Sequence, residues 1–180
     1  MGRTGNGAEV SSSRLKRLAQ DIDALAEKDA EVLRLSRQID QVRRTAASEL
    51  YAICRDFVNS VNGLLSKGEL LLDPDPFSEA SFQEDAVNLI QISVRGRILQ
   101  IAYSATPELV STEDFRIPYT LAGSVRAFNQ ELLDKEIIEE QLVFYTVEKD
   151  RKMWRFFDPR TYRSGTLDQE YLVSVMEQLI

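Results

Sequence analysis

The sequence predicts an α+β fold: a long N-terminal helix, then an antiparallel β-sheet of about five to six strands, then a C-terminal helix packed on the sheet. Three observations lead to this prediction. Apolar residues recur at helical spacing over the first third of the chain, two later segments alternate like β-hairpins, and the last residues return to helical spacing. Apolar residues make up 43% of the 180, which is enough to form a core.

The N-terminal helix is the most strongly patterned element. No proline occurs before Pro74, so we expect helix from about residue 13 to residue 66. Residues 1–12 are rich in Gly and Ser and are expected to form a disordered tail. A heptad stripe follows, and its members are the candidate self-association residues: Leu15, Leu18, Ile22, Leu25, Val32 and Ile39.

The width of the apolar stripe divides the helix into two parts. Over residues 13–45 the stripe is narrow, which is typical of a coiled-coil arm. Polar residues interrupt it at Asp29, Ser36 and Arg43, where they weaken the pairing or restrict the choice of partner. From residue 46 the stripe widens, so we assign residues 46–180 to an α+β globular domain.

Two segments have the alternation of β-hairpins. In residues 87–104, a turn at Arg95-Gly96 pairs Ile92 with Leu99 and Ile90 with Ile101. This strand pair is expected to end at Ala105-Thr106-Pro107. In residues 142–157, a turn at residues 149–152 pairs Val147 with Trp154 and Tyr145 with Phe156.

The remaining elements are expected to be short. Residues 115–119 and 124–130 are predicted strands, and residues 134–141 a short helix. Thr166 with Gln169 three residues later matches a capping box at the start of the C-terminal helix. Leu172, Val175, Met176 and Leu179 then form the face that we expect to pack on the sheet.

The composition excludes several kinds of catalytic site. The chain has no histidine and one cysteine, Cys54, so Ser-His-Asp triads, Cys-His pairs and His-based metal sites are excluded. Glycine-rich phosphate-binding motifs are also missing. We therefore expect no enzyme, cofactor or metal, although 29 acidic residues leave a carboxylate-dependent enzyme as an alternative.

Charge is distributed unevenly along the chain. Residues 1–67 carry 11 basic and 9 acidic side chains, net +2, whereas residues 68–180 carry 11 basic and 20 acidic, net −9. An acidic domain repels nucleic acid and favours basic protein partners. No signal peptide or membrane span is evident, so we expect no membrane association and a cytoplasmic location.

One segment combines basic and aromatic residues. Between residues 151 and 163 lie the four candidate recognition residues: Arg155, Arg160, Tyr162 and Arg163. Such a segment can bind a small ligand or single-stranded nucleic acid through charge and stacking. The simpler interpretation is that the aromatics belong to the core and the cations to the solvated face of a strand and its turn.

The order of helix, hairpin, further strands, hairpin and final helix on an acidic chain is similar to the small dimeric chaperones of bacterial secretion systems. The long N-terminal arm departs from that pattern. The leading hypothesis is a non-enzymatic homodimer that binds another protein, in the manner of a chaperone or adaptor. The alternatives are a sensor of a small ligand or nucleic acid, and a carboxylate-dependent enzyme.

Overall fold

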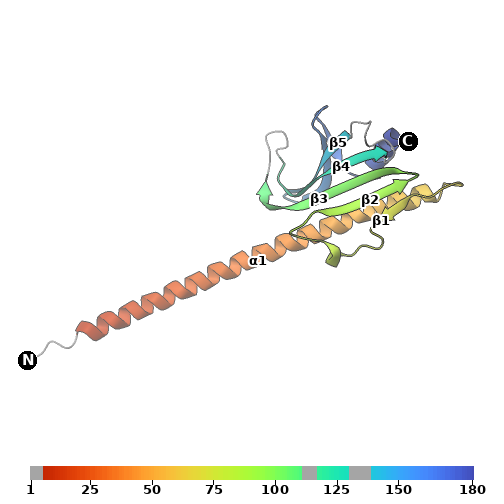
Figure 1. The fold of residues 1–180 in the computed structure, drawn as a ribbon. Helices are drawn as coiled ribbons and strands as arrows, with labels where there is room; N and C mark the ends of the chain where they lie inside the picture. Colours follow the sequence, from red (N-terminus) through yellow and green to blue (C-terminus); the bar gives the residue numbers. More distant parts are fainter. Residues whose placement is uncertain (1–5, 111–116, 130–138) are drawn as a thin grey trace, which may run out of the picture. The chain divides into compact units, whose positions relative to one another are not determined.

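The computed structural model of the chain describes residues 6–110, 117–129 and 139–180. The chain divides into two compact units, Met1–Asp40 and Gln41–Ile180. Helix α1 (Asn6–Asn62) begins in the first unit and ends in the second (Figure 1). It begins within the segment 1–12 that we expected as a tail, and it ends four residues before the expected residue 66.

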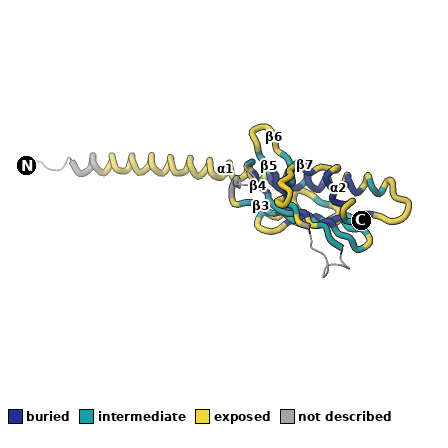
Figure 2. Tube along the Cα trace, turned by 90° about the horizontal axis from the view of Figure 1, so that it is seen from above, coloured by how far each residue is buried: buried dark blue, intermediate teal, exposed yellow. Residues whose placement is uncertain are grey.

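In the first unit, the side chains of residues 11–39 are all exposed. Figure 2 shows this as a continuous exposed stretch of helix. In the second unit, α1 presents a buried stripe from Ala46 to Val58, the wider stripe that the sequence indicated.

The sheet of the second unit is antiparallel and has seven strands among the described residues, one or two more than expected. The strands follow one another as a simple meander, each paired with its neighbours in the chain. They are β1 (Leu71–Asp73), β2 (Asn88–Val94), β3 (Arg97–Val110), β4 (Tyr119–Asn129), β5 (Glu139–Glu148), β6 (Arg151–Asp158) and β7 (Arg163–Thr166). A 3-10 turn, η1 (Glu79–Ser81), precedes β2, and helix α2 (Gln169–Leu179) follows β7.

The first predicted hairpin is confirmed in its register. Strands β2 and β3 pair Ile92 with Leu99 and Ile90 with Ile101. Arg95 and Gly96 both have positive φ, 47° and 78°, the backbone form that a tight two-residue hairpin turn requires.

The register predicted for the second hairpin is wrong by two residues. Strand β5 pairs Tyr145 with Trp154 and Val147 with Lys152, because the turn contains only Lys149 and Asp150. A shift of two residues keeps every side chain on its predicted face of the sheet, so the core aromatics remain in the core.

Strand lengths and the helix cap also differ from expectation. Strand β3 continues past Ala105 to Val110. Strand β4 is one strand from Tyr119 to Asn129, with a register shift at its start, where two shorter strands at 115–119 and 124–130 were predicted. Residues 115, 116 and 130 of those predictions lie outside the described residues. Of the predicted helix 134–141, residues 139–141 belong to β5 and the rest lie outside the described residues.

The cap of α2 is Asp168 and not Thr166. The Asp168 carboxylate accepts a hydrogen bond from the Tyr171 backbone nitrogen at 2.9 Å, which satisfies one of the free N–H groups at the helix start. The predicted packing of α2 is confirmed, because Leu172, Val175 and Met176 are buried in the main core.

The main core lies between one face of the sheet and the two helical segments of the second unit. Trp154 of β6 is buried in it, and its indole nitrogen donates to the Ala46 carbonyl oxygen of α1 at 2.7 Å. A smaller cluster of Tyr119, Phe144 and Phe157 lies on the opposite face of the sheet. The sheet therefore has an extended core on one face and a local aromatic cluster on the other.

Arg43 belongs to the core unit, although the heptad pattern placed it in the arm. Its side chain is buried, and its guanidinium donates to the Thr120 hydroxyl at 2.9 Å, to the Glu84 carboxylate and to the Thr106 carbonyl oxygen. These three bonds join α1 to β3, β4 and the segment before β2. Arg43 thus marks where the exposed helix ends and the sheet unit begins.

Candidate functional site

The six predicted self-association residues lie on the exposed part of α1, and we call them the seam. Between 37% and 64% of each side chain is exposed, from Ile39 at the low end to Leu15 at the high end. Leucine and isoleucine side chains at this spacing on a helix normally lie against another surface. Within this chain the described residues provide no such cover for them.

Two further apolar side chains widen the seam. Leu33 and Leu35 are also exposed, and they occupy the heptad positions on either side of the seam. Sequence reasoning missed both because it followed only the two central positions of each heptad. On the solvated side, Glu31 and Arg34 form an ion pair at 2.6 Å, one turn apart on the helix.

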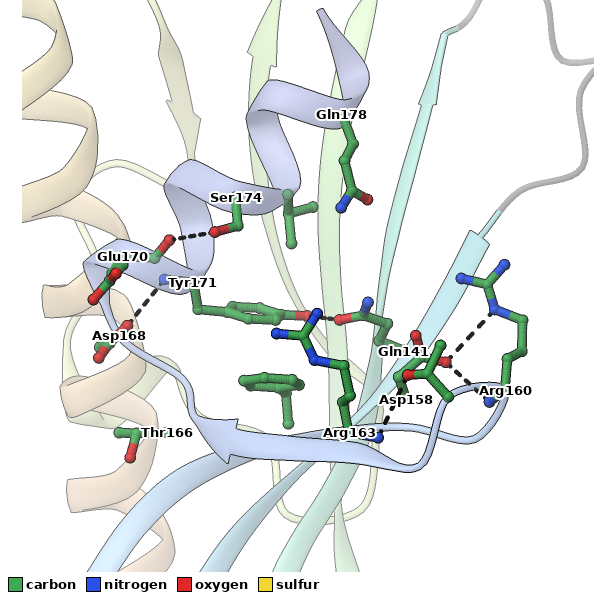
Figure 3. Close-up of a pocket in the computed structure, with 13 residues that line it drawn as sticks. Gln141, Asp158, Arg160, Arg163, Thr166, Asp168, Glu170, Tyr171, Ser174 and Gln178 are labelled. Atoms are coloured by element: carbon green, nitrogen blue, oxygen red, sulfur yellow. Dashed lines mark hydrogen bonds and ion pairs between the residues drawn. The ribbon is translucent and has the colours of Figure 1, made fainter.

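A second candidate site lies in the sheet unit, beside α2. It is a surface cavity of about 540 Å³, which we call the C-terminal groove. Residues of β5, β6, β7 and α2 enclose it (Figure 3). Its lining includes Gln141, Phe156, Asp158, Arg160, Thr161, Arg163, Thr166, Asp168, Glu170, Tyr171, Ser174, Val175 and Gln178.

The wall of the C-terminal groove is a stack of two aromatic rings. The centroids of the Phe156 and Tyr171 rings lie 4.4 Å apart, at an interplanar angle of 23°. Phe156 is also the cross-strand neighbour of Gly165 in β7, where an added Cβ would lie 2.9 Å from the Phe156 ring. The absence of a side chain at Gly165 therefore leaves room for the Phe156 ring.

Tyr171 also fixes the orientation of a glutamine at the same wall. Its hydroxyl donates to the Gln141 side-chain oxygen at 2.6 Å. Burial, assisted by the negative charge of Asp158, raises the pKa of Tyr171, so the phenol stays protonated around neutral pH. Sequence reasoning missed Gln141, Tyr171 and Gln178 because their local sequence carries no binding motif.

The turn before β7 holds the basic residues of the groove. The buried Asp158 carboxylate accepts a hydrogen bond from the Arg160 backbone nitrogen at 2.9 Å and lies 3.5 Å from the Arg160 guanidinium. Burial alone would raise the pKa of Asp158, but hydrogen bonds from Arg160 and Thr161 outweigh it, and the pKa is lowered from 3.8. Asp158 is thus an ionised anchor of the turn.

The structure separates the four candidate recognition residues into two pairs. Arg160 and Arg163 line the C-terminal groove. Arg155 lies opposite Phe144 on the other face of the sheet, and its Nε is buried without a hydrogen bond. The Tyr162 ring is exposed and packs edge-on against the Phe157 ring, with 6.0 Å between the ring centroids. The four residues therefore do not form a single surface for stacking and charge.

Cys54 is buried in the main core, within the part of α1 that packs on the sheet. Burial raises its pKa to about 12, so the reactive thiolate is scarcely populated at neutral pH. Among the described residues, no cluster of three or more Asp, Glu or Cys side chains is arranged to hold a metal ion.

No helix in the described ranges is both long enough and apolar enough to cross a membrane. No protein-family model, curated protein or solved structure matches this chain. The candidate sites are therefore defined by the geometry and chemistry of the seam and the C-terminal groove alone.

Proposed function

We propose that the protein is a non-enzymatic assembly module that forms a homodimer through the seam. One observation carries this proposal: six apolar side chains at heptad spacing are exposed along α1 from Leu15 to Ile39. At 1.5 Å per residue this stripe is about 36 Å long. Burying it in a coiled coil removes these side chains from water, which favours association.

A second copy of the chain suits the seam in both period and charge. An identical helix supplies the same heptad spacing, which knobs-into-holes packing requires. Residues 11–40 carry six basic and six acidic side chains, so two such segments have no net charge to repel one another. The small Ala19 and Ala26 flank the seam and permit close approach of a second helix.

The sheet unit supplies the surface that such a dimer would offer to another protein. With a net charge of −9 over residues 68–180, it favours a partner with a basic surface. A dimer doubles this surface, which strengthens binding to a partner that has two basic sites. This arrangement supports the role of a chaperone or adaptor.

The test replaces Leu25, near the middle of the seam, with glutamate. Losing a packed leucine in each chain costs about 2 kcal/mol or more per chain, so the dimer Kd should rise by roughly a thousandfold. Light scattering should then give a mass near 20.5 kDa for Leu25→Glu and about twice that for the parent chain.

The matched control is Gln20→Glu, which adds the same charge on the side of the helix away from the seam. It should leave the dimer intact, because surface charges contribute little to association. Equal masses for Leu25→Glu and the parent would contradict the proposal. A monomeric Gln20→Glu variant would show that charge, and not seam packing, controls association.

A second candidate function, the sensing of a small ligand by the sheet unit, is favoured by the C-terminal groove. Its volume of about 540 Å³ is in the range of small-molecule sites, and it brings an aromatic wall together with Arg160 and Arg163. The separation of Arg155 and Tyr162 from those two residues disfavours the nucleic-acid version of this alternative.

A further inference from the structure

The C-terminal groove contains a cation that the chain itself leaves without a partner. Among the described residues, the Arg163 guanidinium makes no hydrogen bond and no ion pair, although its neighbour across the strands is the carboxylate residue Asp158. Asp158 instead binds the backbone and the guanidinium of Arg160. Arg163 therefore does not form the cross-strand ion pair with Asp158 that its position would allow.

The backbone fixes the position of Arg163 in the groove. Asp158 and Arg163 are the last pair of the β6–β7 ladder, and the Tyr162 backbone nitrogen donates to the Asp158 carbonyl oxygen at 2.8 Å. Tyr162 has a φ of 57°, the left-handed form that turns the chain back toward β6. Figure 3 shows the Arg163 side chain extending from β7 into the groove that it lines.

Neutral hydrogen-bond donors line the same groove as this guanidinium. The Gln141 side-chain oxygen is occupied by the Tyr171 hydroxyl, which leaves its amide nitrogen free to donate. The Gln178 side-chain amide comes from the next turns of α2 and also borders the groove. The side chains of Arg163, Gln141 and Gln178 all line the groove, between Arg160 on one side and Glu170 on the other (Figure 3).

The groove is lined by two arginines, Arg160 and Arg163, and by three carboxylates, those of Asp158, Asp168 and Glu170. Asp158 and Asp168 already accept hydrogen bonds from backbone nitrogens, of Arg160 and Tyr171 respectively. Asp168 and Glu170 lie at the start of α2, at the opposite end of the groove from Arg160 (Figure 3). Asp158 is paired with Arg160, so these two residues together add no net charge beside Arg163, and the other two carboxylates lie on the far side of the groove from Arg160 (Figure 3).

We propose that the C-terminal groove binds a small organic anion whose carboxylate or phosphate group is held by Arg163. The planar guanidinium can donate two parallel hydrogen bonds to either oxyanion, and the Gln141 and Gln178 amides add neutral donors. The aromatic stack offers a flat surface to the organic part of the ligand. This inference does not depend on dimer formation through the seam.

The experiment measures binding to the full-length protein with four probes: acetate, benzoate, inorganic phosphate and phenyl phosphate. Thermal unfolding is followed at constant ionic strength, up to about 10 mM of each probe, because binding to the folded state raises the melting temperature. A larger shift with the two carboxylates or with the two phosphates identifies the oxyanion. A larger shift with the aromatic member of each pair reports contact with the ring stack.

The decisive variant is Arg163→Gln, and its matched control is Arg151→Gln. Arg151 is an exposed cation at the start of β6 and does not line the groove. Arg163→Gln should retain the melting temperature of the free protein and weaken probe binding by at least roughly tenfold, because it removes charge-assisted hydrogen bonds. Arg151→Gln should bind like the parent.

Three results would overturn the inference. The first is no shift with any probe in the parent protein. The second is unchanged binding to Arg163→Gln. The third is an equal loss of binding in Arg151→Gln, which would assign the shift to general charge and not to the groove.

Discussion

Gly123 is a residue whose side chain must be absent for the sheet to form. It lies in β4 opposite Tyr103 of β3, and an added Cβ would lie 1.9 Å from the Ala102 carbonyl oxygen and 2.7 Å from the Tyr103 Cα. Both of these are backbone atoms, so no change of side-chain rotamer can relieve the contact. Any other residue at this position would force the two strands apart.

We predict that Gly123→Ala lowers the free energy of unfolding by about 3 kcal/mol or more, at or beyond the upper end of the usual cost of overpacking. Urea unfolding followed by circular dichroism measures this difference. The control is Gly63→Ala, just beyond α1, where the nearest atom to an added Cβ is 3.4 Å away. Equal stability of the two variants would mean that β3 and β4 are not as close as described.

Asp158 makes the stability of the β6–β7 turn depend on pH. Its folded-state pKa lies below 3.8, so its charged form stabilises the fold. This contribution is complete above pH 3.8 and is lost as the pH falls through the lower folded-state pKa. Stability that comes from Asp158 should therefore decrease in acid and stay constant from pH 5 to neutrality.

We predict that Asp158→Asn melts at a lower temperature than the parent near pH 6, and that the difference shrinks below pH 3.8. Melting curves of both proteins over this range test it. A difference that stays constant down to about pH 2 would show that the carboxylate charge does not stabilise the turn.

At the scale of elements, the two hairpins show what local sequence determines. Arg95-Gly96 permits one tight turn, and alternation of isoleucines and leucines around it fixes the register of β2 and β3. The second turn, at Lys149-Asp150, has no glycine. Aromatic side chains at positions 154, 156 and 157 also fit two registers that differ by two residues, so the sequence could not distinguish them.

The short edge strands could not be predicted for a different reason. Strands β1 and β7 contain three and four residues, too few to show alternation. Each exists because a longer neighbouring strand presents free backbone groups to it. Strand β3 likewise extends past Pro107 because β4 pairs with it beyond a register shift.

Helix α1 carries two patterns whose border lies at Arg43. The heptad pattern treated Arg43 as a polar seam position, yet its partners Thr120, Glu84 and Thr106 lie 41 or more residues away in the chain. Heptad analysis cannot identify such long-range partners. Among the described residues, every buried side chain lies at Arg43 or beyond it.

We predict that deleting residues 1–40 leaves a folded unit that is monomeric, because the deletion removes the seam and retains Arg43 and the core. Far-UV circular dichroism should show a cooperative melt, and light scattering should give the mass of one truncated chain. A deletion of residues 1–45 serves as the comparison, since it removes Arg43 and leaves Glu84 without its ion pair. It should be less stable than the 41–180 fragment by about 1–3 kcal/mol, because it also removes the bonds from Arg43 to Thr120 and Thr106.

The 41–180 fragment tests both the division of the chain at residue 40 and the location of the dimer contact. An unfolded 41–180 fragment would contradict the division of the chain at residue 40. A folded but dimeric fragment would place the dimer contact outside the seam.

At the scale of the whole molecule, the sequence predicted the α+β class, the antiparallel sheet and the packing of α2. It also identified Arg160 and Arg163, because cations near aromatics stand out in a chain of net charge −7. The C-terminal groove could not be predicted from the sequence. Gln141, Tyr171 and Gln178 line one cavity with those arginines only once the sheet and α2 have formed. The seam was predictable because its pattern lies within one continuous helix.

The central claim is that the seam joins two copies of this chain, and sedimentation equilibrium of the unmodified full-length protein tests it most directly. Measurements from about 1 to 100 μM cover the affinities expected of a short coiled coil. We predict a mass that approaches twice 20.5 kDa as the concentration rises. A mass of 20.5 kDa at every concentration would contradict the claim.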